Sequence, residues 1–258
     1  MKINTGKAIR LGNLIDPQDG RGLWLDLSAP AGIGVVEGLQ NFSEAISQIN
    51  TICDGVIVNP GTLEKSAELF GGARRSAPVV RVDWTNYRRG SNFCLPGKPI
   101  QHVMISDVED ALRLGAEAVL IRHIMGVEDE FEAENVSAIA TLARESDRHG
   151  LPVIVEICPV GDQIRGKNFD AIVKLGVACM LEAGVDGLIV PPCSPDVLRE
   201  IGEWADIPLI LKSDELPELN QLESVFTAGF AGILLSEAIL GKSDFIADLA
   251  NLYNRIHS

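Results

Sequence analysis

The chain has 258 residues, of which 46% are apolar and 22% are charged. This composition excludes a disordered or fibrous protein and is typical of a globule with a substantial buried core. The formal net charge of −14 disfavours long-range attraction to nucleic acid or to an anionic membrane surface. We therefore expect no nucleic-acid partner and no membrane partner, and an anionic substrate would need a local group of basic side chains.

The cysteines and the first residues indicate a cytoplasmic protein. The five cysteines are scattered with no CxxC pair, which argues against a zinc site and against a disulfide framework. The opening segment, MKINTGKAIRLGNL, contains no apolar core of signal-peptide length, and no segment reaches the roughly 18 apolar residues of a membrane span. The sequence therefore predicts a cytoplasmic protein with no cofactor and no bound metal.

Eight short apolar runs are predicted to be β-strands. In chain order they are GLWLDLS from Gly22, CDGVIVNP from Cys53, APVVRVDW from Ala77, GAEAVLIRH from Gly115, LPVIVEIC from Leu151, GVDGLIVPP from Gly184, IPLILKSD from Ile207 and GFAGILLSE from Gly229. Runs of four or five apolar residues suit strands that are buried on both faces, as in a parallel sheet. Three runs begin beside a proline, which is tolerated at a strand's first residue because it has no amide hydrogen to give.

Amphipathic segments fill the gaps between these runs, with apolar residues at the three- and four-residue spacing of a helix. Eight strand–helix alternations favour a closed (β/α)8 TIM barrel over an open doubly wound sheet, which periodicity alone does not exclude. We expect one α/β domain over residues 1–258, with a lead-in at 1–21 and a long loop at 85–105 after the third strand. A polar loop of that length is usually functional or covers the active face.

The residues that end the predicted strands are the candidates for chemistry, because a TIM barrel builds its active site at the C-terminal ends of its strands. They are Asp26, Asn59, Arg81, Asp83, Arg122, His123, Glu156, Cys193, Lys212, Asp214, Ser236 and Glu237. Neighbouring strand residues point to opposite faces, so one member of each adjacent pair faces the helices. Buried ion pairs can also be purely structural, and Arg81 with Asp26 or Glu156 is a candidate for one.

Lys212 and His123 are the strongest single candidates. Lys212 ends the apolar run PLILK, and burial lowers the pKa of an amine so that it can attack a carbonyl and form a Schiff base. A lysine paired with Glu156 or Asp26 is the alternative, and the sequence leaves both open. His123 is the only histidine at a strand end, either as a general acid or base near neutral pH or as a packed side chain facing the helices.

The segment from Gly6 to Gly34, GKAIRLGNLIDPQDGRGLWLDLSAPAGIG, resembles the opening of the archaeal-type class I aldolase family. That family contains fructose-bisphosphate, deoxyribose-phosphate-like and autoinducer-2-processing enzymes. Asn13 to Arg21 resembles the family's Asn/Asp-Pro-Gly-Arg turn, and Asp26 matches its first strand-end aspartate. The resemblance continues through CDGVIVNPGTLEK, DVEDALRLGAEAVLIR, LPVIVEICPVGDQI and AGFAGILLSEAI. It implies the barrel fold, a small-molecule substrate and a homo-oligomer.

The chain departs from the family at its chemical positions. The family's Schiff-base lysine lies at the end of the sixth strand, where this chain has Ile189, which cannot form an imine. The family's phosphate site uses Gly-Gly after the seventh strand and Gly-Arg after the eighth. This chain has Lys212-Ser213-Asp214 and Ser236-Glu237-Ala238 there, and the two carboxylates would repel a phosphate.

Together these features predict an aldolase-like lyase or transferase that makes or breaks a carbon–carbon bond beside a ketone. Lys212 would form the imine or stabilise negative charge, and Asp26, Glu156 and His123 would complete the catalytic group. The predicted substrate-binding residues are Arg81, Arg122, Asn59, Asp83 and Glu237, with Arg88 and Arg89 as further cations. Two alternatives stay open, namely a lysine-independent isomerase or metal-assisted lyase, and a non-catalytic pseudo-aldolase.

Overall fold

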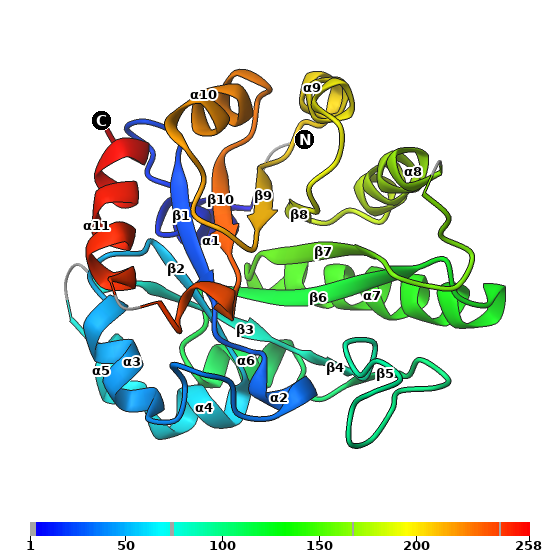
Figure 1. Cartoon of the computed structure of the whole chain (residues 1–258), viewed down its shortest axis with the longest axis horizontal. Helices are drawn as coiled ribbons and strands as arrows, with labels where there is room; N and C mark the ends of the chain where they lie inside the picture. Colours follow the sequence, from blue (N-terminus) through cyan, green and yellow to red (C-terminus); the bar gives the residue numbers. More distant parts are fainter. Residues whose placement is uncertain (1–3, 73–74, 167, 243) are drawn as a thin grey trace.

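The computed structural model describes residues 4–72, 75–166, 168–242 and 244–258, and its centre is a closed barrel of parallel strands (Figure 1). The barrel strands are β1 (Gly22–Asp26), β2 (Gly55–Val58), β3 (Ala77–Arg81), β6 (Ala118–Met125), β7 (Val153–Pro159), β8 (Gly187–Val190), β9 (Leu209–Ser213) and β10 (Gly232–Leu235). Neighbours in the barrel follow chain order, and β1 closes the ring by pairing with β10. The predicted TIM barrel and its eight strands are confirmed.

Helices surround the barrel on its outside (Figure 1). The longer ones are α1 (Thr5–Gly12), α3 (Phe42–Ile49), α7 (Asp129–His149), α8 (Phe169–Glu182), α9 (Pro195–Trp204), α10 (Leu219–Thr227) and α11 (Phe245–Ile256). Shorter ones are α2 (Pro30–Ile33), α4 (Pro60–Lys65), α5 (Ala67–Phe70), α6 (Val108–Arg113) and the 3-10 turn η1 (Glu237–Ile239). None of the described helices combines the length and the hydropathy that a membrane span needs.

The barrel interior is apolar over most of its depth. Its buried side chains come from all eight strands or their approaches and include Trp24, Ile57, Val79, Leu120, Ile154, Ile189, Ile210 and Leu234. Leu14, which precedes β1, closes the lower end, where its carbonyl accepts a hydrogen bond from the Trp24 indole at 2.8 Å. Ile189, in β8, is a fully buried part of this core.

The segment after β3 is more ordered than a plain loop. Its ends form a two-stranded antiparallel sheet of β4 (Asp83–Thr85) and β5 (His102–Met104). The Asn86 side chain ties the two ends together, because it donates to the Pro99 carbonyl at 3.0 Å and accepts from the Gln101 amide at 2.6 Å. The Arg89 guanidinium lies over the Trp84 ring and donates to the Gly32 carbonyl beside α2. The segment therefore covers part of the barrel mouth.

Gly202 in α9 allows a close contact between α9 and the end of α10. A Cβ atom at this position would lie 1.6 Å from the carbonyl oxygen of Ala228, which follows α10. We expect Gly202→Ala to lower the free energy of unfolding by about 2–3 kcal/mol, measured by urea denaturation, because the two helices must separate. Gly12→Ala in α1 is the control, since nothing lies within 4 Å of its added atom. Equal effects of the two substitutions would contradict this account of the packing.

Candidate active site

A layer of charged side chains lies above the apolar pore, at the C-terminal ends of the strands. It contains three carboxylates and three cations, namely Asp26, Asp83, Glu156, Arg81, Arg122 and Lys212. Strand alternation explains the layer, because Trp24 and Asp26, Ile154 and Glu156, and Ile210 and Lys212 are each two residues apart on one face. The structure thus brings together six of the predicted site residues, and their formal charges cancel.

Arg81 is fully occupied by protein acceptors. Its Nε donates to Ser28 Oγ at 2.6 Å, its Nη1 to Glu156 at 3.0 Å and its Nη2 to Asp26 at 2.8 Å. Its side chain is only 1% exposed. Arg81 therefore holds the layer together, which is the purely structural role that the sequence left open for it. Each of its three nitrogens has a protein partner, so none is free for a substrate.

Arg122 is held more loosely. Its Nη1 lies 3.4 Å from both carboxylate oxygens of Asp83, and its Nε lies 3.5 Å from Glu156. Burial opposes its charge, but Asp83 and Glu156 outweigh that effect and raise the pKa of Arg122. Its guanidinium lies 5.8 Å from the centre of the Tyr87 ring, so Tyr87 covers this side of the layer. Long contacts leave Arg122 more able than Arg81 to bind an additional acceptor.

Lys212 is the most accessible member of the layer. Its ammonium nitrogen lies 2.6 Å from Glu156 Oε1, and its side chain is 24% exposed, against 9% or less for the other five. Burial favours the neutral amine, but the neighbouring Glu156 outweighs burial and raises the pKa of Lys212. Conversely, Lys212 and Arg81 overcome burial and lower the pKa of Glu156. Of the two states left open by the sequence, the structure contains the ion pair of Lys212 with Glu156.

Asn59 and Glu237 lie at the edge of this layer. Asn59 donates to the Ser28 carbonyl at 3.0 Å, and its own side-chain oxygen is buried without a partner among the described residues. Glu237 is buried and forms an ion pair with Arg88 from the long segment after β4. This pair links that segment to the end of β10, across the barrel mouth.

His123 does not join the charged layer, although the sequence made it a candidate acid or base. It is fully buried on the side of β6 that faces α7, where its Nδ1 lies 3.1 Å from Asn135 Oδ1. Neighbouring residues of β6 alternate, so Arg122 enters the barrel and His123 leaves it. The structure therefore places His123 in the packed arrangement that was the alternative.

Four residues that contact the layer were not among the site residues predicted from the sequence, namely Ser28, Tyr87, His102 and Asn135. His102 Nε2 lies 3.2 Å from Asp83, and Asn135 donates to the Arg122 carbonyl at 2.9 Å. Asn135 sits on the buried face of α7 among apolar residues, and a polar residue in such a stripe is the one signal that the sequence offers. His102 and Asn135 thus support Asp83 and Arg122 from outside the barrel.

Burial lowers the pKa of His123, and this has a consequence for stability. Below the unfolded-state pKa of about 6.5 the unfolded chain binds a proton that the folded chain refuses, so stability falls as pH decreases. We expect urea denaturation to find that the wild type loses about 1 kcal/mol more than His123→Gln between pH 7 and pH 5.5. His149→Gln, at an exposed position at the end of α7, is the control for the substitution itself. A His123→Gln loss equal to that of the wild type would refute this assignment.

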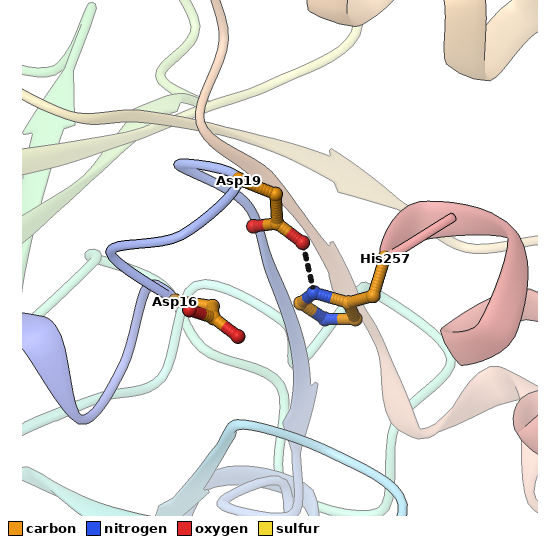
Figure 2. A group of neighbouring side chains, drawn as sticks. All are labelled: Asp16, Asp19 and His257. Carbon is orange, nitrogen blue, oxygen red and sulfur yellow. Dashed lines mark hydrogen bonds and ion pairs between the residues drawn. The ribbon is translucent and has the colours of Figure 1, made fainter.

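One group of described residues has the spacing of a metal site, but it lies at the opposite end of the barrel (Figure 2). It comprises Asp16, Asp19 and His257, from the turn before β1 and the end of α11. His257 Nδ1 lies 2.7 Å from Asp19, and Nε2 lies 3.1 Å from Asp54. Both ring nitrogens thus face carboxylates, an arrangement that fastens α11 to the barrel floor and is remote from the strand ends.

Comparison with known proteins identifies the family. A model of the DeoC/LacD aldolase family matches residues 17–190. The 2-amino-3,7-dideoxy-D-threo-hept-6-ulosonate synthase 1 of Archaeoglobus fulgidus is 23% identical over 226 residues, covering 86% of this chain and 80% of that protein. The class 1 fructose-bisphosphate aldolase of Thermoproteus tenax is 25% identical over 201 residues, covering 74% and 70%.

Solved structures agree on the fold. The Schiff-base-forming fructose-1,6-bisphosphate aldolase superposes with a TM-score of 0.78 at 19% identity, over 97% of this chain and 99% of the other. An archaeal fructose 1,6-bisphosphate aldolase gives a TM-score of 0.77 with the same identity and coverage. The relatives are aldolases and related synthases, so the resemblance stated from the sequence is confirmed. The chain belongs to the DeoC/LacD aldolase family and has the fold of an aldolase-type carbon–carbon lyase.

Proposed function

We propose that the protein makes or breaks a carbon–carbon bond in a small oxo substrate, and that Lys212 acts in this reaction as an ammonium ion. The observation that carries the proposal is the position of Lys212, which is the accessible cation of an otherwise closed layer. An ammonium has three N–H donors, and Glu156 accepts one of them at 2.6 Å. The other two can bind a substrate oxygen. The family resemblance further implies a cytoplasmic homo-oligomer.

Charge stabilisation fits this lysine better than imine chemistry. Only a neutral amine attacks a carbonyl, whereas Glu156 raises the pKa of Lys212 and keeps its proton in place. Cleaving a bond beside a ketone leaves an enolate, whose oxygen is negative. A fixed ammonium ion beside that oxygen lowers the energy of the transition state, because the negative charge develops next to a cation that is already in place. Lys212 thus replaces the family's imine by electrostatic stabilisation.

The charges around Lys212 favour a substrate with one carboxylate over a phosphosugar. The six charges of the layer cancel, and the Arg88–Glu237 pair beside them is also neutral. Such a site offers little net attraction to a phosphate dianion. Arg122, whose contacts with Asp83 are long, is the donor best suited to a single carboxylate. The unpartnered side-chain oxygen of Asn59 would accept a hydrogen bond from a substrate hydroxyl.

Tyr87 is the group best suited to return a proton to the substrate. The pKa values of Asp26 and Glu156 are lowered despite their burial, because Arg81 and Lys212 hold both carboxylates ionised. Burial raises the pKa of Tyr87, so its phenol keeps its proton at neutral pH. Its ring covers Arg122 at the mouth of the layer. Asp26 and Glu156 therefore position the cations. As the carbon–carbon bond breaks, the hydroxyl of the departing aldehyde gives its proton to a solvent water, Tyr87 gives its own proton to the enolate carbon, and the phenolate regains a proton from solvent. In the reverse direction the same phenolate, formed after Tyr87 has released its proton to solvent, removes the proton beside the carbonyl, which is the step that exchange detects.

Hydrogen–deuterium exchange tests this function with a single substrate. An enzyme that forms an enolate exchanges the protons beside the carbonyl with solvent, which proton NMR in D2O detects without a second substrate. With pyruvate, 2-oxobutanoate, hydroxyacetone and dihydroxyacetone as the panel, we expect exchange with the oxo acids to exceed exchange with the neutral ketones. Lys212→Met is the matched control and should exchange no faster than buffer. Exchange with none of the four, or equal exchange by Lys212→Met, would overturn the proposal.

A further inference from the structure

A groove runs along the outside of the barrel between β5 and α7. One wall is the run 101–104, and all four of these consecutive residues line the groove. Because side chains alternate along a strand, four consecutive lining residues indicate that the backbone edge of β5 faces the groove. The other wall is one face of α7, with Phe131, Glu134 and Ala138 at successive turns. An adjoining hollow shares Met104, Glu134 and Ala138 and extends the groove to Glu145.

β5 has an unpaired edge on this side. β4 pairs with one edge of β5, and no other described strand pairs with it. The Ile105 amide donates to the Val82 carbonyl at 2.8 Å. Along an antiparallel pair, residues whose backbone groups bond to the partner strand alternate with residues whose groups point away from it, so Val103 is the next residue that faces β4. The backbone N–H and C=O groups of His102 and Met104 therefore point away from β4, toward the groove. Such an edge is a template for a further strand.

The groove is apolar at its floor and acidic at its rim. Val103 and Met104 are exposed on the strand side, and Phe131, Ala138 and Leu142 are the apolar residues of the helix side. The acidic residues that line it are Asp107, Glu128, Glu130, Glu134 and Glu145, and no lysine or arginine is among the described lining residues. Carboxylates beside apolar surface complement a partner that carries basic and apolar side chains together.

We propose that this groove binds an extended segment of a partner protein, in which apolar and basic residues alternate, by adding that segment to β5 as a strand. Main-chain hydrogen bonds to His102 and Met104 would supply affinity, and alternation of the bound strand would direct its apolar side chains to the α7 floor. Its basic side chains would then meet the acidic rim. This inference is independent of the proposed enzymatic function, because the groove lies outside the barrel.

A labelled peptide tests the groove directly. The probe is a fluorescein-tagged heptapeptide of alternating lysine and valine, titrated with the full chain in 0.15 M salt and followed by fluorescence anisotropy. At that ionic strength charges more than about 8 Å apart are screened, so diffuse attraction to the acidic protein is weak. We expect saturable binding, at least tenfold weaker for a peptide that is N-methylated at its central valine and at the lysine after it, because one of two consecutive amides has to donate to β5.

Two variants of α7 form the matched pair. Ala138→Arg places a bulky cation inside the groove, whereas Ala133→Arg adds the same side chain on the exposed face of the same helix. Ala138→Arg should weaken peptide binding at least tenfold and Ala133→Arg should not. If Ala138→Arg lowers the melting temperature, Glu134→Arg at an exposed position takes its place and should show the same loss.

Three results would overturn the proposal. They are the absence of saturable binding, equal binding of the N-methylated peptide, and equal binding by the groove variant and its control. Sedimentation velocity adds one further outcome, because a second copy of this chain could occupy the same groove. A wild-type oligomer that dissociates in Ala138→Arg but not in Ala133→Arg would assign the groove to a second copy and reject the peptide partner.

Discussion

Replacing Arg81 with methionine will lower the free energy of unfolding by about 3–5 kcal/mol, the loss expected when one partner of a buried charged network is removed. Arg81 is 1% exposed and neutralises Asp26 and Glu156, while Ser28 accepts from its Nε. Without it these carboxylates stay buried with less opposing charge, which low-polarity surroundings make costly. Urea denaturation at pH 7, followed by circular dichroism, measures the difference.

Arg199→Met is the matched control for this result. Arg199 lies on the exposed side of α9, and its pair with Asp196 at 3.3 Å is a surface contact. Exposed pairs contribute little because water screens them and long side chains lose freedom in forming them. We expect this variant to unfold as the wild type does. A small effect of Arg81→Met, comparable to that of Arg199→Met, would show that the charged layer is not the structural centre proposed for it.

Lys212→Met should reduce kcat by about 100- to 1,000-fold on any oxo substrate that the wild type turns over, as the loss of one donor to a developing oxyanion does. The variant should still fold, because Glu156 keeps Arg81 at 3.0 Å and Arg122 at 3.5 Å. The measurement is steady-state kinetics together with a thermal melt. A split in which kcat falls and KM changes little would indicate stabilisation of the transition state.

Lys174→Met provides the control for Lys212→Met. Lys174 pairs with Glu200 at 3.0 Å between α8 and α9, outside the barrel and far from the strand ends. Lys174→Met removes the same number of charges as Lys212→Met but leaves the site unchanged, so the kcat of this variant should equal that of the wild type. Equal kcat values for Lys212→Met and Lys174→Met would reject a catalytic role for Lys212.

Local patterns in the sequence were sufficient to predict the barrel. Each strand combines an apolar run with a glycine, alanine or proline at its start, and these signals depend only on neighbouring residues. In the structure, strand alternation explains why Asp26, Glu156 and Lys212 enter the barrel, because each follows an inward-facing apolar residue by two positions. The residues at the strand ends could therefore be identified from sequence, together with the family.

The protonation state of Lys212 could not be predicted in the same way. Lys212 and Glu156 are 56 residues apart, and only the closed barrel brings their charged atoms to 2.6 Å. Burial alone would have favoured a neutral amine, so the pKa depends on a partner that the local sequence does not reveal. The pairing of Lys212 with Glu156 was one of two states considered, and the sequence had no means of choosing.

Local sequence patterns also could not predict which side of its strand His123 faces, or which residues contact the charged layer from outside. Arg122 and His123 are consecutive, and either could have faced the pore until the pairing of β6 with β7 was known. Tyr87 lies in an irregular segment with no periodicity, and its place over Arg122 depends on the β4–β5 pair. Asn135 alone had a local signal, as a polar residue within the buried stripe of α7.

Borohydride trapping tests the central claim, that Lys212 acts as an ammonium and not as an imine former. The wild-type protein is incubated with each oxo acid of the panel and with sodium borohydride, which reduces an imine to a stable amine, and its peptides are mapped by mass spectrometry. A Schiff-base-forming aldolase treated in parallel is the positive control. We predict deuterium exchange by the same sample and no substrate adduct on Lys212. An adduct at Lys212 would contradict the account and restore imine catalysis on β9.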